Sequence, residues 1–489
     1  MKKIAYIALA GGILLALLSL LADVIGLGKG GIQAAQLLGL QIGILFVLAG
    51  WGSLLVVKDG YRMPVWRQIY TFGERILDLP VTVWFLVSFL GVYFLFFVSP
   101  VFLNAKLQMA YVNRYLPHTG LIGADIRVFV EYIEQWLRSG QSPYKSGYIA
   151  YPPFSFFLFS PLVLVGYPAN FRLITMMTLA SYLLVAFIVP RLLLAGKSTL
   201  LLLLVFVSGL FSYGFQFELE RGQSNLIAFA FCIFGIYIFH FHRRFRLFAY
   251  LLFSLSVQLK LYPAIFILLF VDDWQAWMKN IKRFLGLALF NVLLLFVMGI
   301  AAFEDFVKAL LFQQFNLSQW NGNHSIRAFA VNFTSHGFGL FSPEVVAFLG
   351  QYTRVIEVTL MGIVVGCIVF LIFKAYRRKE RGLNPYLLLA CTIGALVIPS
   401  VSNDYKLSLL PASVAILFSG FSISGKPWKK LSVILLILLF SSAFWSALYP
   451  FKVKPEFLSS TFPLLLIMLV LETVLYFVVG NANREIIPA

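Results

Sequence analysis

The chain carries an isolated carboxylate in a setting where it could take a proton from a hydroxyl group. Asp125 lies in ADIRVFVEYIEQWLRSG, residues 124–140, where apolar residues recur at helical spacing. A carboxylate held by a helix can act as a general base. Asp also favours the N-cap of a helix, where it bonds backbone N–H groups. The sequence alone leaves both roles open.

A lysine in an apolar segment is the second candidate. Lys260 lies in SVQLKLYPAIF, residues 256–266. A lysine at membrane depth costs roughly 3 kcal/mol on insertion scales, so it needs an anionic partner or a route to the surface. Pro263 should break the helix just beyond it and free backbone groups, as happens beside binding cavities. Lys260 is therefore either a snorkelling lysine or an anion ligand.

Three further polar clusters interrupt the apolar sequence: ELERGQSN (218–225), NLSQWNGNHSIRAF (316–329) and SNDYK (402–406). Each could be an ordinary solvated loop. Together they hold cations, amides and aromatic rings, the groups that bind a sugar or a phosphate. With two tyrosines of residues 144–151, the candidates are Arg221, Gln223, Asn225, Trp320, Asn323, His324, Ser325, Arg327, Asp404, Tyr405, Tyr144 and Tyr151.

The composition shows what must position these groups. Hydrophobic residues make up 61% of the 489 and charged residues 12%, and the mean hydropathy is +0.90. Long apolar runs recur throughout, so we expect an all-α polytopic membrane protein and not a barrel. The net charge of +18 fits Lys and Arg in cytoplasmic loops better than a nucleic-acid partner. The three cysteines lie in apolar segments at no ligand spacing, which predicts neither disulfides nor a metal site.

Charged loops predict the topology at the two ends of the chain. Lys2 and Lys3 place the N-terminus inside, before an apolar segment that we interpret as an uncleaved first helix. Crossings at 4–23, 36–57 and 82–103 then bring the loop 104–150 to the outer face. Counting back from the basic loops near the C-terminus places residues 304–353 and 401–406 outside as well.

The middle of the chain allows two solutions. If every apolar segment crosses once, there are 14 spans, but HFHRRFR (240–246) then lies outside, against the positive-inside rule. The alternative splits 246–271 at KLYP and makes an earlier segment re-entrant. We favour the split because it brings Lys260 to the outer side. The segments concerned are 154–166, 169–190, 199–217, 224–241, 246–271 and 284–303.

The order of the short motifs resembles a known family. GQSPY…YPP, RGQSN, LKLYP, NHSIRAF and SNDYKLSLLP follow one another over about residues 82–415. This pattern is similar to polyprenyl-phosphate-sugar-dependent transferases of the GT-C superfamily, above all glycosyltransferase family 87, which includes mycobacterial mannosyltransferases that make phosphatidylinositol mannosides. The resemblance implies a GT-C fold of about 13–14 transmembrane helices with large outer loops carrying amphipathic helices. The implied parts are an N-terminal two-helix addition (1–81), a conserved module (82–303) with the outer loop 104–150, a second outer loop (304–353) and C-terminal helices (354–489).

The resemblance also implies roles for the candidates. Asp125 matches the catalytic aspartate of the family's first outer loop. The donor phosphate would be bound by Lys260, Arg327, Arg127 and Arg221, and the substrates by the remaining candidates. The family's late Trp-Asp-His-Tyr is replaced here by Ser402-Asn403-Asp404-Tyr405, which leaves the sugar and the acceptor open. We expect Asp125, Lys260 and Arg327 to converge on one outer cavity within about 10–12 Å, one helix diameter.

The implied reaction moves mannose or another hexose or pentose from a polyprenyl-phosphate donor to a hydroxyl of a lipid or glycan, with inversion. It would take place on the outer face of a bacterial cytoplasmic membrane, in glycolipid biosynthesis for the cell envelope. No cofactor is expected, and the need for a divalent metal and the oligomeric state stay open. Two alternatives remain: a lipid or anion transporter or flippase, and an outer-face glycan ligase that uses a pyrophosphate-linked lipid.

Overall fold

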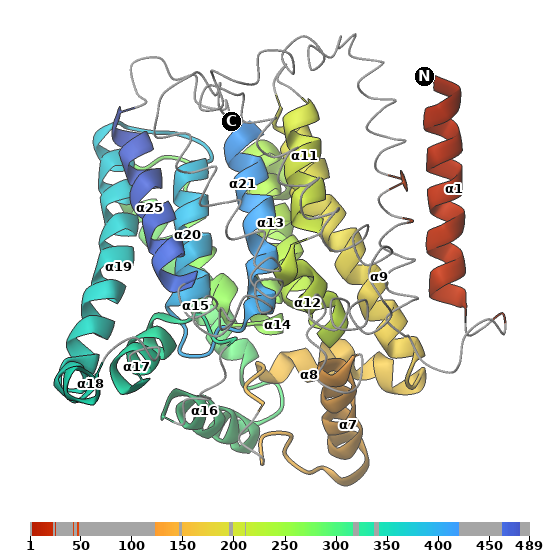
Figure 1. The fold of residues 1–489 in the computed structure, drawn as a ribbon, viewed down its shortest axis with the longest axis horizontal. Coiled ribbons are helices and arrows are strands. Elements are labelled where there is room, and N and C mark those ends of the chain that lie inside the picture. Colours follow the sequence, from red (N-terminus) through yellow and green to blue (C-terminus); the bar gives the residue numbers. More distant parts are fainter. Residues whose placement is uncertain are drawn as a thin grey trace.

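The computed structural model describes residues 2–22, 25, 43, 46–47, 123–145, 149–194, 199–210, 212–315, 322–336, 342–419 and 462–479. Every named element in these ranges is a helix, and the bundle they form is shown in Figure 1. The expected all-α architecture is confirmed for this part of the chain.

The first half of the described chain includes α7, the helix that carries Asp125. Its elements are α1 (Lys2–Leu21), α7 (Ala124–Ser139), α8 (Pro153–Phe159), η3 (Ser160–Leu164), α9 (Ala169–Leu183), η4 (Leu184–Ile188), α10 (Val189–Leu192), α11 (Thr199–Leu210), α12 (Tyr213–Arg221), α13 (Asn225–Phe241), η5 (Arg243–Phe245), α14 (Arg246–Leu259) and η6 (Tyr262–Leu269).

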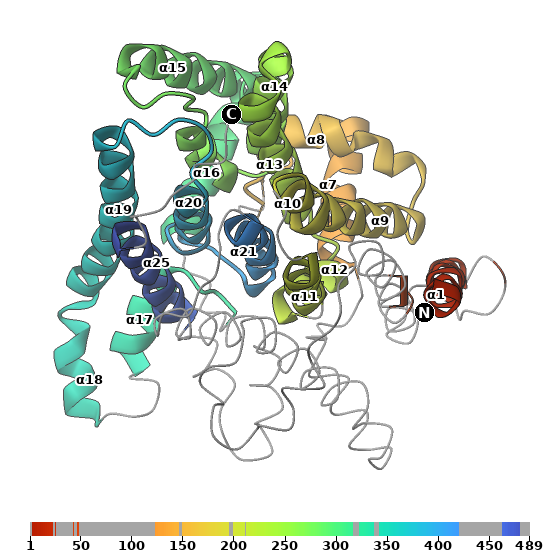
Figure 2. The same ribbon diagram turned by 90° about the horizontal axis from the view of Figure 1, so that it is seen from above.

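The second half supplies the rest of the core and several short helices. Its elements are α15 (Trp277–Leu294), α16 (Ile300–Phe315), α17 (Ile326–His336), α18 (Pro343–Gly350), α19 (Thr353–Arg377), α20 (Pro385–Val397), η8 (Asp404–Leu409), α21 (Leu410–Ser419) and α25 (Phe462–Val479). All residues of α20 are buried, as are most of α13 and α21. Seen from above, α19 and α25 flank this centre on one side, while α14 and α15 form a separate edge (Figure 2).

Two helices of the described chain are long and apolar enough to cross a membrane, Ala169–Leu192 and Thr353–Arg377. A third candidate is the pair Leu202–Leu210 and Gly214–Arg221, which bends by 50° at its break. These apolar helices are those of a membrane protein. The total of 13–14 crossings stays a prediction, and the expected crossings at 36–57 and 82–103 lie outside the described residues.

The helix break at KLYP that the preferred split of 246–271 requires is present, while the two short crossings stay a prediction. Helix α14 ends at Leu259, Lys260 adopts extended backbone angles, and a separate 3-10 helix, η6, starts at Tyr262 with Pro263 in its first turn. The chain therefore reverses at Lys260. As a result Lys260 returns to the N-terminal end of α13, here called the site end.

The opposite end of this hairpin is here called the basic end. His240 Nε2 donates to the Leu269 carbonyl at 2.8 Å there, and Arg243 and Arg246 belong to the turn into α14. The 17 residues of α13 separate the two ends by about 25 Å at 1.5 Å per residue.

The expected single span at 284–303 is wrong. Helix α15 ends at Leu294, and α16 begins only at Ile300, after Gly299 with a φ of +90°. Glycine adopts this left-handed angle without steric cost, so the chain can turn sharply here. Helix α16 then lies beside α8 at the site end (Figure 1), where Phe306 contacts Tyr144 with ring centroids 5.6 Å apart.

Candidate functional site

Asp125 occupies the first turn of α7 without capping it. The N-cap is Gly123, with a φ of +74° and no side-chain cap bond. The Gly123 N–H donates to the Glu220 carbonyl at 2.7 Å, which ties the start of α7 to the end of α12. The Asp125 carboxylate accepts instead from Arg221 and Gln223. The N-cap interpretation is therefore wrong, and Asp125 belongs to a cluster between α7 and α12.

The turn between α12 and α13 presents Gln223 to Asp125. Gly222 ends α12 with a φ of +66°, and an added Cβ would lie 2.7 Å from the side chain of Ile126 on α7. Glycine thus permits both the turn and the close approach of α7. Beside the turn, buried Glu218 accepts from Asn225 Nδ2 at 2.9 Å and from the Leu226 N–H at 3.1 Å. The carboxylate of Glu218 therefore satisfies the free N-terminus of α13.

Gln223 joins Asp125 to Lys260. Its Nε2 donates to Asp125, while its Oε1 accepts from Lys260 Nζ at 2.9 Å and from the Tyr151 hydroxyl at 3.3 Å. The Lys260 ammonium also lies 3.9 Å from the centre of the Tyr151 ring, a cation–π contact. The Gln223 amide thus bonds directly to both Asp125 and Lys260 and fixes their relative positions.

Lys260 is anchored by its neighbours on both sides. The Lys260 N–H donates to the Ser256 carbonyl at 3.1 Å, and the Tyr262 hydroxyl donates to the Asn225 carbonyl at 2.7 Å. In the part of the chain that the structure describes, no carboxylate lies within ion-pair distance of its ammonium group. Its cationic charge is therefore held in place without a directly bonded counter-charge.

The late cluster SNDYK also reaches this site. Burial raises the pKa of Tyr405, and the Asp125 carboxylate raises it further. The Tyr405 ring contacts Phe217 of α12 with centroids 5.6 Å apart. The neighbouring Lys406 donates to the Val401 carbonyl at 2.9 Å. Burial lowers the pKa of Lys406 to about 8, although Glu218 raises it.

Residues 322–325 and 400–404 pair with each other, and we call this pair the loop clasp. The His324 N–H donates to the Ser402 carbonyl and the Asp404 N–H to the Gly322 carbonyl, both at 2.8 Å. Asn323 Oδ1 accepts from two backbone N–H groups, and its Nδ2 and the Ser325 hydroxyl both donate to the Ser400 carbonyl. Asn323 and Ser325 therefore join two loops that lie about 80 residues apart in sequence.

His324 and Asp404 are buried inside the loop clasp. Nδ1 of His324 lies 3.3 Å from Asp404 Oδ1, and Nε2 lies 3.2 Å from the Ser402 hydroxyl. Since a carboxylate only accepts, Nδ1 carries the proton and Nε2 accepts from Ser402. Burial lowers the pKa of His324 to about 3, so the imidazole is neutral at ordinary pH.

Several other predicted residues lie outside the Asp125 cluster. Arg127 pairs with Glu131 at 3.2 Å and is 47% exposed. Tyr144 is buried, and its hydroxyl donates to the Tyr151 carbonyl at 2.8 Å, so it supports Tyr151 from behind. Arg327 is half-buried one residue into α17, and its convergence with Asp125 stays a prediction. Trp320 lies outside the described residues.

Glu218 and Lys406 are part of the cluster although sequence reasoning did not select them. Both belong to polar clusters that it did find, ELERGQSN and SNDYK. A carboxylate one helical turn before Arg221 was a usable signal. Within the described ranges, no group of three or more His, Cys, Asp or Glu side chains is arranged to hold a metal ion.

The assembled cluster can bind an anion next to a proton acceptor. Arg221, Lys260 and Lys406 supply positive charge, and Asp125 supplies a carboxylate whose two oxygens are oriented by hydrogen bonds. Fixed cations of this kind stabilise a leaving group on which negative charge develops. The arrangement therefore suits group transfer from a phosphate ester to a hydroxyl.

A model of glycosyltransferase family 87 matches residues 148–400, about half of the 489-residue chain. The matched range contains Tyr151, Gln223 and Lys260, while Asp125 precedes it and Asp404 follows it. No curated protein and no solved structure matches the chain. The extent of the family match shows that the chain belongs to glycosyltransferase family 87.

Proposed function

We propose that this glycosyltransferase takes its sugar from a polyprenyl-phosphate donor on the outer face of the membrane, within a GT-C fold. The observation that carries the proposal is the Asp125–Gln223–Lys260 arrangement: a proton acceptor and an ammonium group without a bonded carboxylate, fixed by one amide. A lipid-borne phosphate diester is an anion that such a site can bind directly from the bilayer.

The donor phosphate would bind Lys260, with Lys406 and Arg221 beside it. When the sugar leaves, the phosphate changes from a diester with one negative charge to a monoester with about 1.5 to 2. Cations that are already in place stabilise this extra charge in the transition state more than in the ground state. The neutral partners of Lys260, an amide and an aromatic ring, leave its charge available for the phosphate.

Asp125 would act as the general base. The acceptor oxygen bonds to the anomeric carbon as its proton moves to the Asp125 carboxylate, and the bond between that carbon and the phosphate oxygen breaks with its electron pair going to the phosphate. In-line attack inverts the anomeric centre. A second carboxylic acid is not required, because the phosphate leaves without a proton, unlike the alkoxide released by a glycosidase.

The substitution Asp125→Asn tests the base. We expect transfer to be abolished with expression and folding unchanged, because the amide keeps the shape of Asp125 but cannot take a proton. Purified protein in lipid nanodiscs is supplied with a panel of polyprenyl-phosphate hexoses and pentoses, and release of free polyprenyl phosphate is measured. The matched control is Glu131→Gln, an exposed carboxylate on the same helix. Full turnover by Asp125→Asn contradicts the base assignment.

Lys260→Met tests the phosphate site in the same assay. The side chain keeps its length and loses its charge, so the KM for the donor should rise at least tenfold, the equivalent of one charge-assisted hydrogen bond of ~1.5–3 kcal/mol. Lys308→Met, at a 71% exposed lysine of α16, is the control. If the protein exports lipid and releases no polyprenyl phosphate, the result favours a transporter. If the Asp125→Asn variant also exports lipid at the wild-type rate, the protein is a transporter.

A further inference from the structure

An apolar groove with a basic rim lies between α14 and α15, near the basic end. It has a volume of about 820 Å³, within the range of roughly 300–1,000 Å³ typical of ligand pockets. The two helices run side by side at the edge of the molecule (Figure 2). Its lining includes Leu247, Leu251 and Gly286 on the apolar wall and Lys279, Lys282 and Arg283 at the rim.

The groove lies on the basic side of a polar clamp between the two helices. Asn291 Nδ2 donates to the Ser254 hydroxyl at 3.0 Å, and Gln258 Nε2 donates to the Asn291 carbonyl at 3.0 Å. On the other side of this clamp, Gly286 faces open space, since an added Cβ would meet nothing within 4 Å. The helices are thus joined near the site end and leave apolar space near the basic end.

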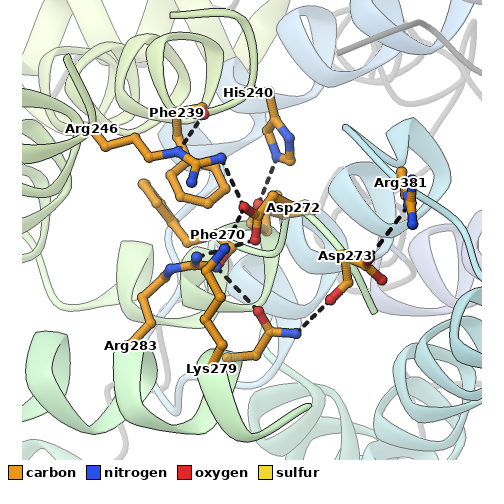
Figure 3. A network of polar contacts seen from close by, with 11 residues as sticks. Phe239, His240, Arg246, Phe270, Asp272, Asp273, Lys279, Arg283 and Arg381 are labelled. Carbon is orange, nitrogen blue, oxygen red and sulfur yellow. Dashed lines mark hydrogen bonds and ion pairs between the residues drawn. The ribbon is translucent and has the colours of Figure 1, made fainter. Parts of the chain in front are cut away.

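Positive charge exceeds negative charge at the rim. Asp272 is the shared partner of Arg246 at 2.8 Å, Lys279 at 3.1 Å and Arg283 at 3.1 Å (Figure 3). One carboxylate therefore faces three cations. Lys282 adds a fourth, exposed cation, which forms no ion pair with the residues that the structure describes.

The buried part of this network holds the rim rigid. Arg283 also donates to the Phe270 carbonyl at 2.6 Å, and its guanidinium lies 4.8 Å from the centre of the Phe239 ring, with Arg246 at 4.7 Å from the same ring. Burial alone would raise the pKa of Asp272, but Lys279, Arg283 and Arg246 lower it well below its usual value. The rim has a net positive charge because the single carboxylate of Asp272 balances only one of the three cations that it contacts.

We propose that this groove binds an anionic diacyl phospholipid, with the headgroup phosphate at Lys279 and Lys282 and an acyl chain along the apolar wall. Basic pockets between membrane helices bind acidic headgroups in this way. The sugar donor is a different ligand, because a phosphate at Lys260 lies about 20 Å away along α14. The site is therefore separate from the transfer reaction and does not rest on it.

Retention of lipid by the purified protein tests the proposal. Full-length protein is reconstituted with equimolar phosphatidylglycerol and phosphatidylcholine, re-extracted in mild detergent, and its bound lipids are counted by native mass spectrometry. The charge variant is Lys279→Gln with Lys282→Gln, which keeps the ion pairs of Asp272 with Arg246 and Arg283. The groove-filling variant is Gly286→Leu, which has open space to fill.

Each variant has a matched control on α19. Lys374→Gln with Arg377→Gln removes two cations from the last turn of another helix. Gly362→Leu adds a side chain to a helix glycine that also faces open space. We expect the wild type and both controls to retain phosphatidylglycerol over phosphatidylcholine, the charge variant to lose this preference roughly tenfold, and Gly286→Leu to retain less of either lipid.

Two results would overturn the proposal. Equal retention of the two lipids by the wild type would show that the cations do not select an acidic headgroup. Retention by the charge or groove-filling variant that matches its control would place the bound lipid elsewhere on the protein. Neither result depends on transferase activity, so a failed lipid site and a failed donor assignment are distinguishable.

Discussion

At the scale of single residues, Gln223 contacts both the proposed general base, Asp125, and the proposed phosphate ligand, Lys260. Its amide donates to the proposed base and accepts from the proposed phosphate ligand, so one side chain fixes both in relation to the substrate. Bonds to charged groups contribute about 1.5–3 kcal/mol each, and misplacement of a catalytic group by an ångström lowers rates steeply. Gln223 is thus a positioning residue.

Gln223→Leu should lower kcat for sugar transfer at least tenfold with a smaller effect on the KM for the donor, because Asp125 loses its orienting donor while Lys260 keeps its charge. Gln223→Glu can still accept from Lys260 but cannot donate to Asp125, so it should recover the KM and not kcat. Steady-state kinetics on both variants check this. The control is Gln135→Leu, at an exposed glutamine of α7. Wild-type kcat in Gln223→Leu contradicts the positioning role.

The sequence made Asp125 and Lys260 visible because each interrupts a pattern that predicts something else. Arg221 and Gln223 were also candidates, but their pairing with Asp125 and Lys260 was not predictable in the same way. Arg221 lies 96 residues from Asp125, and Gln223 lies 37 residues from Lys260. Such contacts follow from how helices stack, which no local spacing encodes. The choice between a helix cap and a site residue at Asp125 was decided by one backbone fact, the left-handed Gly123 at the N-cap.

At the scale of elements, the glycine turn after α12 sets the distance between α7 and Gln223. Gly222→Ala should cost about 1–3 kcal/mol, because the left-handed backbone is strained for alanine and its Cβ would meet Ile126 at 2.7 Å. We expect a lower Tm in detergent and a loss of transfer larger than the loss of folded protein. Gly362→Ala, in an open part of α19, should leave both unchanged. An unaltered Tm in Gly222→Ala would mean that α7 does not depend on this turn.

The loop clasp should weaken as the pH falls, because its buried His324 is neutral. The pKa of His324 is about 3 in the folded protein, against 6.5 ordinarily. The unfolded chain therefore binds more protons below pH 6.5, and folding stability that is fully present above pH 6.5 is lost progressively toward pH 3. The Tm of the wild type should fall more between pH 7.5 and 4.5 than that of His324→Gln, measured by scanning fluorimetry in detergent. Equal falls would contradict a buried neutral His324.

Some elements were predictable from local pattern and others were not. Apolar spacing predicted α7, and the helix ends at Gly140, whose N–H donates to the Trp136 carbonyl. Lys260 and Pro263 predicted the break after α14. The break between Leu294 and Ile300 was missed, because the apolar sequence continues through it. Hydropathy indicates which residues prefer an apolar environment, and it does not indicate where one helix ends and the next begins within an apolar segment.

At the scale of the whole molecule, polar chemistry is divided between two ends. The site end holds Asp125, Gln223 and Lys260, and the basic end holds the Asp272 network. The sequence predicted this division when the topology that places HFHRRFR outside was rejected and the split that brings Lys260 to the outer side was preferred. The structure confirms that the α13–α14 hairpin separates them by the length of a helix.

Accessibility of the two ends from opposite sides of the membrane is the remaining prediction at this scale. In a background without Cys232, Cys367 and Cys391, all of them buried, a single cysteine is introduced by Glu131→Cys on α7 or by Arg244→Cys in η5. Both positions are exposed. A membrane-impermeant maleimide is added to spheroplasts before or after permeabilisation, and the labelled protein is measured by mass.

We expect Glu131→Cys to be labelled on intact spheroplasts and Arg244→Cys only after permeabilisation. Moving Arg243 and Arg244 across the bilayer would cost free energy, so a short loop that contains them stays on the cytoplasmic side. The proposed donor, a polyprenyl-phosphate sugar in the outer leaflet, must reach Asp125 from the other side. Labelling of both cysteines from one side would contradict the division into two ends. Labelling with the sides exchanged would keep the division and place the transfer reaction on the cytoplasmic face, which would overturn the outer-face proposal.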